Sequence, residues 1–259
     1  MSLRSVVCLA VFAATALVQS GRALAQVEDS AEVQPEAWQL VEMANQARAV
    51  AGARPLKWDP ALAVAARQHC LRMAAVGPIS HRYAGESDLS SRAGDAGAHF
   101  SMIEENVAVG PTLDSIHVGW MHSPGHRANM LNPGVDRVGV AVVASRGQLY
   151  AVADYESSVK VLEPEHVEAT VSRLLRARGL SLREDATDAR AYCAESNNAQ
   201  VSAPPGFAMM WQSADITRLP QKLLDRLATG QYHEAAVGAC SPTDLGGSFT
   251  AYRVAVLLY

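Results

Sequence analysis

The sequence predicts an α+β fold in which helices are grouped around a small antiparallel sheet. Two observations lead to this prediction. Three segments with apolar residues at helical spacing occupy the first part of the chain, and two adjacent β runs follow them. After residue 164 a similar order of segments begins again. The 259 residues, of which 49% are hydrophobic, are sufficient for a packed core.

The first 25 residues have the pattern of a cleaved secretory signal peptide. Arg4 supplies a positive charge, an apolar run follows at residues 6–18, and Ala23-Leu24-Ala25 is typical of a cleavage site. The alternative, an uncleaved anchor, is less favoured because the run is shorter than the roughly 20 residues that a membrane span needs. We therefore expect a secreted or periplasmic protein without a transmembrane segment after cleavage, beginning with a flexible arm at residues 26–35.

Two helices are predicted at the start of the first domain. The first helix begins at Pro35 and ends before Gly52. Residues 55–58 are expected to form a short connector. Asp59-Pro60 provides the N-cap and first residue of a second helix, which Gly77-Pro78 ends.

A long loop, a third helix and a hairpin complete this domain. Residues 79–111 contain several glycines among polar residues, and a loop of that length is typical of the wall of a site. Thr112 is expected to cap a helix that runs to about Met121. The apolar runs 137–143 and 148–155 are separated by a short turn and are predicted to form a β-hairpin.

Residues 159–259 are predicted to form a second, divergent α+β domain. The segment 167–193 is similar to the segment 41–70, since both have an opening Val-Glu, an arginine near a helix end, a glycine and a second helix that closes on a cysteine. A helix at 214–230 and two β runs follow. A degenerate internal repeat and two unrelated helix-rich segments are both compatible with this pattern, and the order of the pieces favours the repeat.

The charge of the chain argues against two kinds of partner. The formal net charge is −4, and loss of Arg4 and Arg22 with the signal peptide makes it −6. No basic stripe is present, which argues against binding to nucleic acid or to an anionic membrane surface.

Three cysteines remain after removal of the signal peptide: Cys70, Cys193 and Cys240. In an oxidising compartment we expect one disulfide and one free thiol. Three pairings are possible. Cys193–Cys240 is favoured because both residues lie in the C-terminal segment, whereas Cys70 lies in an Ala-rich helix and is expected to be a buried apolar residue.

The predicted domain at residues 36–158 resembles the CAP superfamily, which comprises cysteine-rich secretory, antigen 5 and pathogenesis-related 1 proteins, in its bacterial secreted branch. The resemblance rests on several short motifs in the order of the family. They are Asn45 to Arg48, Leu56 to Asp59, Leu62 to Met73, Ser80-His81, Glu105 to Gly110, Trp120 to Arg127 and Val138 to Ala141. The resemblance implies an α-β-α sandwich. No motif of the site occurs after Cys193, so a repeat would have lost it.

The resemblance also implies a cleft with two histidines and two glutamates. The matching residues are His81, Glu105 and His126, which we predict as a catalytic or binding triad. The second glutamate is replaced by Ser123, which is neither a strong ligand nor a base near neutral pH. His69 has no such motif around it and is expected to pack in the core with its helix face.

A second pair of histidines, His122 and His126, are four residues apart, as in H-E-x-x-H zinc sites. Ser123-Pro124-Gly125 lies between them and disfavours a continuous helix. We therefore expect a helix end at about His122 and a loop that directs His126 into the cleft. The spacing of the two histidines is then incidental.

The predicted metal ligands are His81 and His126, with water or Glu105 completing the coordination of zinc or another divalent cation. Two histidines and a carboxylate are a sufficient ligand set for a zinc that activates water. Glu105 could not easily serve as ligand and general base together. Structural roles for Glu105, as an acceptor from nearby backbone N–H groups, and for His126 are the alternative.

Three functions are compatible with these residues. The favoured function is a secreted protein that binds a metal or an unidentified small-molecule, lipid or envelope-derived ligand. A metal-dependent hydrolase acting on peptide or cell-wall material is the second. A structural envelope protein, with the second domain used for assembly, is the third. The sequence does not indicate the ligand or the oligomeric state.

Overall fold

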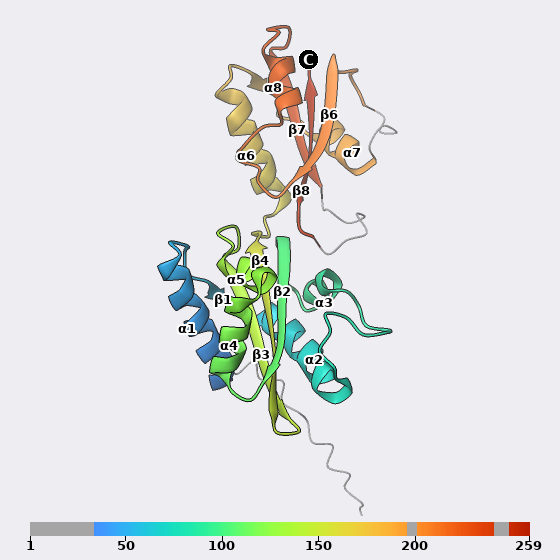
Figure 1. Ribbon diagram of the computed structural model, residues 1–259. Helices are drawn as coiled ribbons and strands as arrows, with labels where there is room; N and C mark the ends of the chain where they lie inside the picture. Colours follow the sequence, from blue (N-terminus) through green and yellow to red (C-terminus); the bar gives the residue numbers. More distant parts are fainter. Residues whose placement is uncertain (1–33, 196–200, 241–248) are drawn as a thin grey trace, which may run out of the picture. The chain divides into compact units, whose positions relative to one another are not determined.

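The computed structural model describes residues 34–195, 201–240 and 249–259. The predicted signal peptide and residues 26–33 of the predicted arm lie outside this part of the chain. The described residues contain two α+β regions, each with its own four-stranded sheet (Figure 1). Among them, no helix has the length and apolar character needed to cross a bilayer.

The first region contains five helices and four strands among the described residues. The helices are α1 (Pro35–Val50), α2 (Pro60–Val76), α3 (Leu89–Asp95), α4 (Leu113–His122) and α5 (Pro124–Leu131). The strands are β1 (Lys57–Trp58), β2 (Phe100–Gly110), β3 (Arg137–Ser145) and β4 (Gln148–Ser158), in the sheet order β1-β3-β4-β2. The α+β prediction is confirmed for this region.

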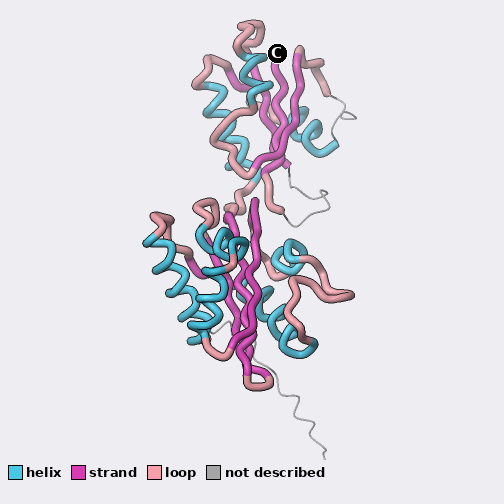
Figure 2. The backbone as a smooth tube through the Cα atoms, viewed as in Figure 1, coloured by secondary structure: helices cyan, strands magenta, loops and turns pink. Residues whose placement is uncertain are grey.

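Helices cover both faces of this sheet. Helices α2 and α3 pack on one face, and α1, α4 and α5 on the other (Figures 1 and 2). Leu40, Trp120 and Tyr155 belong to the core on the α1 side. Met73 and Val152 belong to the core on the α2 side. Strand β2 is at one edge of the sheet, so one side of its backbone is open to other groups.

The residues predicted to cap the starts of helices do so in the structure. The Asp59 carboxylate accepts hydrogen bonds from the backbone N–H groups of Ala61 and Leu62 at the start of α2. Thr112 forms a capping box with Ser115 at the start of α4. The helices predicted from Pro35, Asp59-Pro60 and Thr112 and the hairpin of β3 and β4 are all present.

Three local predictions for this region are wrong. Residues 79–111 are not mainly loop, since α3 and the 11-residue strand β2 lie within them. The expected connector contains β1, which pairs in parallel with β3, so the sheet is mixed and not antiparallel. His126 lies in helix α5 and not in a loop, because Ser123 ends α4 and also precedes α5. Pro124 takes the first helical position of α5, where a missing N–H is no loss.

The second region has the same order of strand pairing as the first. Its helices are α6 (Pro164–Arg176), α7 (Thr187–Glu195) and α8 (Gln221–Leu227). Its strands are β5 (Ser181–Leu182), β6 (Phe207–Ser213), β7 (Glu234–Cys240) and β8 (Tyr252–Leu258), in the order β5-β7-β8-β6. As in the first sheet, the first pair is parallel and the other two are antiparallel.

One element of this second region differs from its sequence prediction, and the disulfide agrees with it. The helix expected at 214–230 is shorter, since α8 begins only after Pro220. The favoured pairing of Cys193 with Cys240 is confirmed and joins α7 to β7. Cys70 is buried and is free, and burial raises its pKa to about 12, so it behaves as the apolar core residue that was expected.

Candidate functional site

Two of the three predicted site residues, His81 and Glu105, line a cleft at the open edge of β2. The cleft has a volume of about 420 Å³, which is within the range of small-molecule sites. Its walls come from the segment after α2, from the start of α3, from β2 and from α5. The lining residues are His81, Arg82, Asp88, Leu89, Ile103, Glu104, Glu105 and Asn129.

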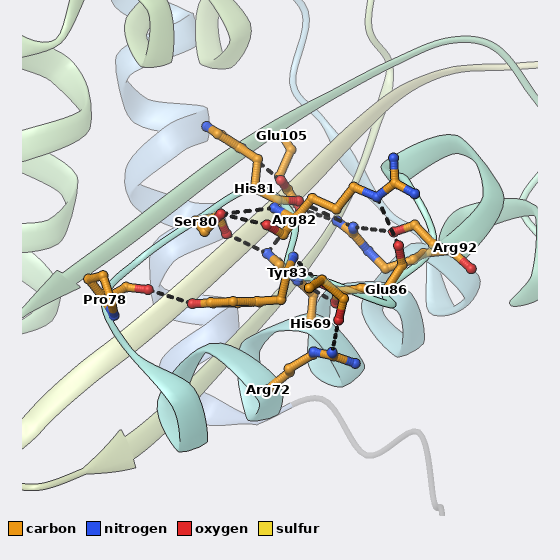
Figure 3. Close-up of polar contacts among 12 residues, drawn as sticks. His69, Arg72, Pro78, Ser80, His81, Arg82, Tyr83, Glu86, Arg92 and Glu105 are labelled. Atoms are coloured by element: carbon orange, nitrogen blue, oxygen red, sulfur yellow. Dashed lines mark hydrogen bonds and ion pairs between the residues drawn. The ribbon is translucent and has the colours of Figure 1, made fainter.

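Glu105 forms the buried base of the site. Only 6% of the residue is exposed, and its two carboxylate oxygens accept from different donors (Figure 3). Nδ1 of His81 lies 2.7 Å from Oε1, and Nη2 of Arg92 donates to Oε2. The predicted alternative, in which nearby backbone N–H groups hold this carboxylate, is therefore wrong, because side chains from two other segments hold it.

Arg92 was not identified in the sequence as a site residue. It belongs to α3 and is itself buried, with 6% of the residue exposed. Besides Glu105, its guanidinium donates to the backbone carbonyls of His81 and Ser87. Arg92 thus fixes both the carboxylate and the segment that carries the first histidine. A buried arginine is suited to this because its several donors have a rigid planar arrangement and can bond to different acceptors at once.

His81 has one ring nitrogen committed and one available. Because the partner of Nδ1 is a carboxylate, Nδ1 carries the proton and Nε2 is left with a free lone pair when the ring is neutral. The hydrogen bond to Glu105 raises the pKa of His81, and burial opposes this only in part. The side chain is 60% exposed, so Nε2 can meet a ligand.

His126 faces His81 from the other side of the β2 edge. The centroids of the two imidazole rings are 6.4 Å apart. Burial lowers the pKa of His126, and the nearby His81 lowers it further. Asn106 donates to the backbone carbonyl of His126, while Asn129 donates to the carbonyl of Glu105 and to Oδ1 of Asn106. These two asparagines tie α5 to β2 and so hold the histidine over the cleft.

His69 is buried, as expected, but it also supports the site. Its Nδ1 lies 2.7 Å from Oε1 of Glu86, and its Nε2 lies 2.8 Å from the carbonyl of Ser80 (Figure 3). The same nitrogen is 3.9 Å from Oε2 of Glu105. His69 therefore anchors the backbone immediately before His81. Helical spacing in the sequence placed this residue in the core but could not indicate its partners.

The structure therefore brings His81, Glu105 and His126 together and leaves the other two candidates aside. Ser123 is the junction between α4 and α5 and its side chain forms no capping hydrogen bond. His122 is exposed, and its Nδ1 contacts the carbonyl of Val118 in its own helix. His122 and His126 are four residues apart in the sequence but do not share a site.

The residues present fit a metal bound by two imidazoles but not by three protein ligands. Within the described ranges, no group of three or more His, Cys, Asp or Glu residues is arranged to hold a metal ion. Both oxygens of Glu105 already have partners, so the carboxylate orients His81 and is not a free ligand. Zinc binds imidazole nitrogen at about 2.0–2.1 Å, so two rings in tetrahedral geometry have centroids roughly 5 Å apart. The ring centroids are 6.4 Å apart, so the two rings would have to move slightly closer together to bind one zinc ion.

The hydrogen bond of His81 leads to a testable pH dependence. NMR titration of the imidazoles is expected to give His81 a pKa above its ordinary value of 6.5 and His126 a pKa below it. Because the folded-state pKa of His81 is raised, protonated His81 adds stability that is complete below the unfolded pKa and is lost as the pH rises through the folded pKa. In Glu105→Gln the His81 pKa should fall towards 6.5, whereas His126→Ala should leave it raised. A native His81 pKa at or below 6.5 would contradict the hydrogen bond from His81 to Glu105.

Comparison with known proteins supports the likeness read from the motifs. Residues 41–155 match the model of the cysteine-rich secretory protein family, CAP. The uncharacterized protein YkwD of Bacillus subtilis (strain 168) is 32% identical over 110 residues, which are 41% of this chain and 42% of YkwD. The chain thus spans less than half of the length of that relative.

Solved structures of similar proteins include the following two. An extracellular protein containing an SCP domain from Bacillus anthracis is 25% identical, with a TM-score of 0.43 over 47% of this chain and 40% of that one. NaASP2, solved with Zn²⁺, is 13% identical, with a TM-score of 0.37 over 50% of this chain and 83% of that one. From its family match and its bacterial relative, the chain contains, over residues 41–155, a domain of the cysteine-rich secretory protein (CAP) family.

Proposed function

We propose that the CAP domain is a binding module whose cleft holds a divalent cation through Nε2 of His81 and the imidazole of His126. The observation that carries this proposal is the hydrogen bond of 2.7 Å from Nδ1 of His81 to the buried Glu105. Histidines that bind metals commonly donate their second ring N–H to a carboxylate, which fixes the tautomer and the ring orientation. Zinc is the favoured cation because the available ligands are nitrogens.

The remaining coordination positions are left for water or for a ligand from outside the chain. A cleft of about 420 Å³ is lined by His81, and its walls combine the apolar Leu89 and Ile103 with polar groups. Such a mixture suits a small-molecule, lipid or envelope-derived ligand with a metal-binding head group. The metal would supply electrostatic attraction for that group, while the protein side chains orient it.

The geometry favours binding over hydrolysis. A zinc hydrolase needs a carboxylate or another base that can accept a proton from the metal-bound water. Glu105 is engaged by His81 and Arg92, and Ser123 provides no carboxylate at the fourth position. We therefore assign Glu105 an orienting role and propose no catalytic step.

We infer that the second region is a divergent CAP-like domain that has lost the site. The two sheets share the order and direction of strand pairing. Each also has a glycine where a helix crosses the sheet: a Cβ on Gly139 would lie 2.1 Å from the nitrogen of Ala63, and a Cβ on Gly238 would lie 2.3 Å from the carbonyl carbon of Ala189. Residues equivalent to the cleft motifs are absent from its sequence, so we propose that it serves as a packing partner or recognition surface.

We further propose that the protein acts outside the cytoplasm, either in the periplasm or in the medium. Its N-terminal sequence has the pattern of a signal peptide. The disulfide between Cys193 and Cys240 is typical of an oxidising compartment. The Bacillus anthracis protein with an SCP domain is described as extracellular, in agreement with this proposal.

Titration calorimetry with Zn²⁺ and metal analysis of the full chain test the binding proposal. We expect one zinc per chain, and a loss of affinity of more than about 100-fold in His81→Ala/His126→Ala, since losing a ligand costs more than losing an outer-shell partner. His122→Ala is the matched control, because His122 lies in the adjacent helix turn but outside the site.

Equal zinc affinity in the native chain and the double variant, or no binding by either, would refute the proposal. Assays on peptide and murein substrates address the hydrolase alternative. Turnover that depends on zinc and on His81 would replace the binding function by a hydrolytic one.

A further inference from the structure

A second buried acid, Asp154, lies directly beside the carboxylate that orients His81. Asp154 of β4 is the cross-strand partner of Glu105 in β2. Residues directly opposite each other in an antiparallel pair point to the same face, with Cβ atoms about 4.5–5.5 Å apart. Asp154 is also opposite Gly139 in β3, and the position of a Cβ on Gly139 is against α2. The two acids therefore share the face of the sheet that α2 and α3 cover.

The surroundings of Asp154 do not suit an ionised carboxylate. The residue is 0% exposed, and neither carboxylate oxygen has a hydrogen-bond donor among the described residues. The cation that acts on Asp154 is Arg92 in α3, but its guanidinium donates to Glu105 and to two backbone carbonyls instead. From β2 the group that faces Asp154 is the negative Glu105. Burying an ionised acid with these neighbours carries a large desolvation cost.

One proton shared between the two acids removes this conflict. Two close carboxyl groups cannot both ionise easily, so one of them keeps its proton. Burial raises the pKa of Asp154, the charge of Glu105 raises it further, and Arg92 offsets only part of this. Glu105 is the ionised member, since Arg92 and His81 both donate to it. A carboxylate can accept about four hydrogen bonds, so Glu105 can also accept from a protonated Asp154.

We propose that Asp154 is a positioning residue of the cleft, a neutral carboxylic acid whose O–H donates to Glu105 and holds that carboxylate against His81 and Arg92. The chain of contacts is then Asp154 to Glu105 to His81, with the last ring presenting Nε2 to the ligand. Asp154 adds a donor without adding charge, so Glu105 remains a single negative charge fixed from three sides. The affinity part of this inference rests on the proposed metal-binding function, and the protonation part does not.

Two substitutions of nearly the same size separate the role of the donor from that of packing. Asp154→Asn is neutral and can still donate an N–H to Glu105, whereas Asp154→Val has a similar volume and no donor. We expect Asp154→Asn to keep zinc affinity within about threefold of the native chain. We expect Asp154→Val to lose about 10–100-fold, the usual cost of removing an outer-shell partner. Equal affinity in the native chain and in Asp154→Val would overturn the positioning role.

Infrared spectroscopy and NMR test the protonation without any metal. At pH 7 the native chain should show the carbonyl stretch of protonated carboxylic acids, and the part that Asp154 contributes should be lost in Asp154→Asn. The remaining part belongs to Glu156, whose pKa burial raises to about 8. The pKa of His81 should be the same in both, because neither carries a charge at residue 154. An equally strong band in the native chain and in Asp154→Asn, or a lower His81 pKa in Asp154→Asn, would show that Asp154 is ionised and would overturn the inference.

These metal-free results also separate this inference from the proposed function. If zinc fails to bind the native chain but the band is weaker in Asp154→Asn than in the native chain, the metal-binding function fails and the protonated Asp154 stands. Should Asp154→Val fail to fold, the comparison of the native chain with Asp154→Asn still decides whether Asp154 is protonated.

Discussion

Replacing Gly139 with alanine is expected to destabilise the CAP domain by about 3 kcal/mol or more, a large part of the stability of a domain. Gly139 lies in β3 at the point where the sheet meets the first turn of α2. A Cβ built there would lie 2.1 Å from the nitrogen of Ala63 and 2.2 Å from the carbonyl carbon of Leu62. These are backbone atoms, so no rotamer change can relieve the contact. The helix would have to move away from the sheet.

Such a movement would disturb two structures at once. Helix α2 supplies Leu62 and Met73 to the core, and it carries His69, which anchors the segment of His81. We therefore expect Gly139→Ala to lower both the free energy of unfolding, measured by urea denaturation, and the hydrogen-exchange protection of β3. A change of less than about 1 kcal/mol would show that α2 can shift freely, contrary to the packing described above.

The matched control is Gly119→Ala in helix α4, which lies on the other face of the sheet. Gly119 is exposed, and a Cβ there would meet no atom within 4 Å. Alanine is favoured over glycine in a helix by about 1 kcal/mol, so this variant should be slightly more stable than the native chain. The parallel substitution Gly238→Ala should affect the second region in the same way, since a Cβ on Gly238 would lie 2.3 Å from the nitrogen of Arg190 in α7. Hydrogen exchange reports the two regions separately.

The comparison of Gly139 and Gly119 also illustrates what the sequence can and cannot predict. Helical spacing and capping residues such as Asp59 and Thr112 predicted the long helices, because these signals act within a few residues of the chain. Strand β2 was not predicted, since Glu104 and Glu105 interrupt its apolar pattern. Those charges are tolerated because β2 is an edge strand that lines the cleft. The charged residues that line the cleft thus interrupt the apolar pattern by which a strand is recognised in a sequence.

The residues of the candidate site also differ in how far the sequence alone indicates them. Short motifs singled out His81, Glu105 and His126. In the folded chain His81 contacts Glu105, and the ring centroid of His126 lies 6.4 Å from that of His81. Arg92 and Asp154 carry no such motif, and their importance depends on a helix packing against β2 and on the register of β2 with β4. Cross-strand register is a property of the folded sheet, so a single sequence does not contain it in readable form.

Arg48 is another residue whose role only the folded structure explains. It belongs to α1, is 0% exposed, and has no carboxylate partner among the described residues. Its guanidinium instead donates to the backbone carbonyls of Met130 and Asn132 at the end of α5, with further bonds to Val135 and Arg54. The C-terminal end of a helix carries a partial negative charge and carbonyls without partners in the helix. A buried arginine balances the charge and donates hydrogen bonds to the carbonyls.

Replacing Arg48 with methionine is therefore expected to destabilise the CAP domain by about 3–5 kcal/mol. Methionine fills similar space, but the buried carbonyls lose their donor, and each unsatisfied group costs about 1–3 kcal/mol. Urea denaturation should show a lower midpoint with an unchanged slope. Arg54→Met, at an exposed arginine nearby, should change stability by no more than about 0.5 kcal/mol.

The consequence of Arg48→Met for the cleft follows from its position on α5. The same short helix carries His126 near its start and ends on the carbonyls that Arg48 holds. Loosening that end should let His126 move relative to His81. The zinc affinity of the folded variant, measured without urea, should therefore be lower than that of the native chain. Full stability in Arg48→Met would mean that water satisfies the carbonyls. Lost stability with native zinc affinity would mean instead that Asn106 and Asn129 alone hold His126 in place.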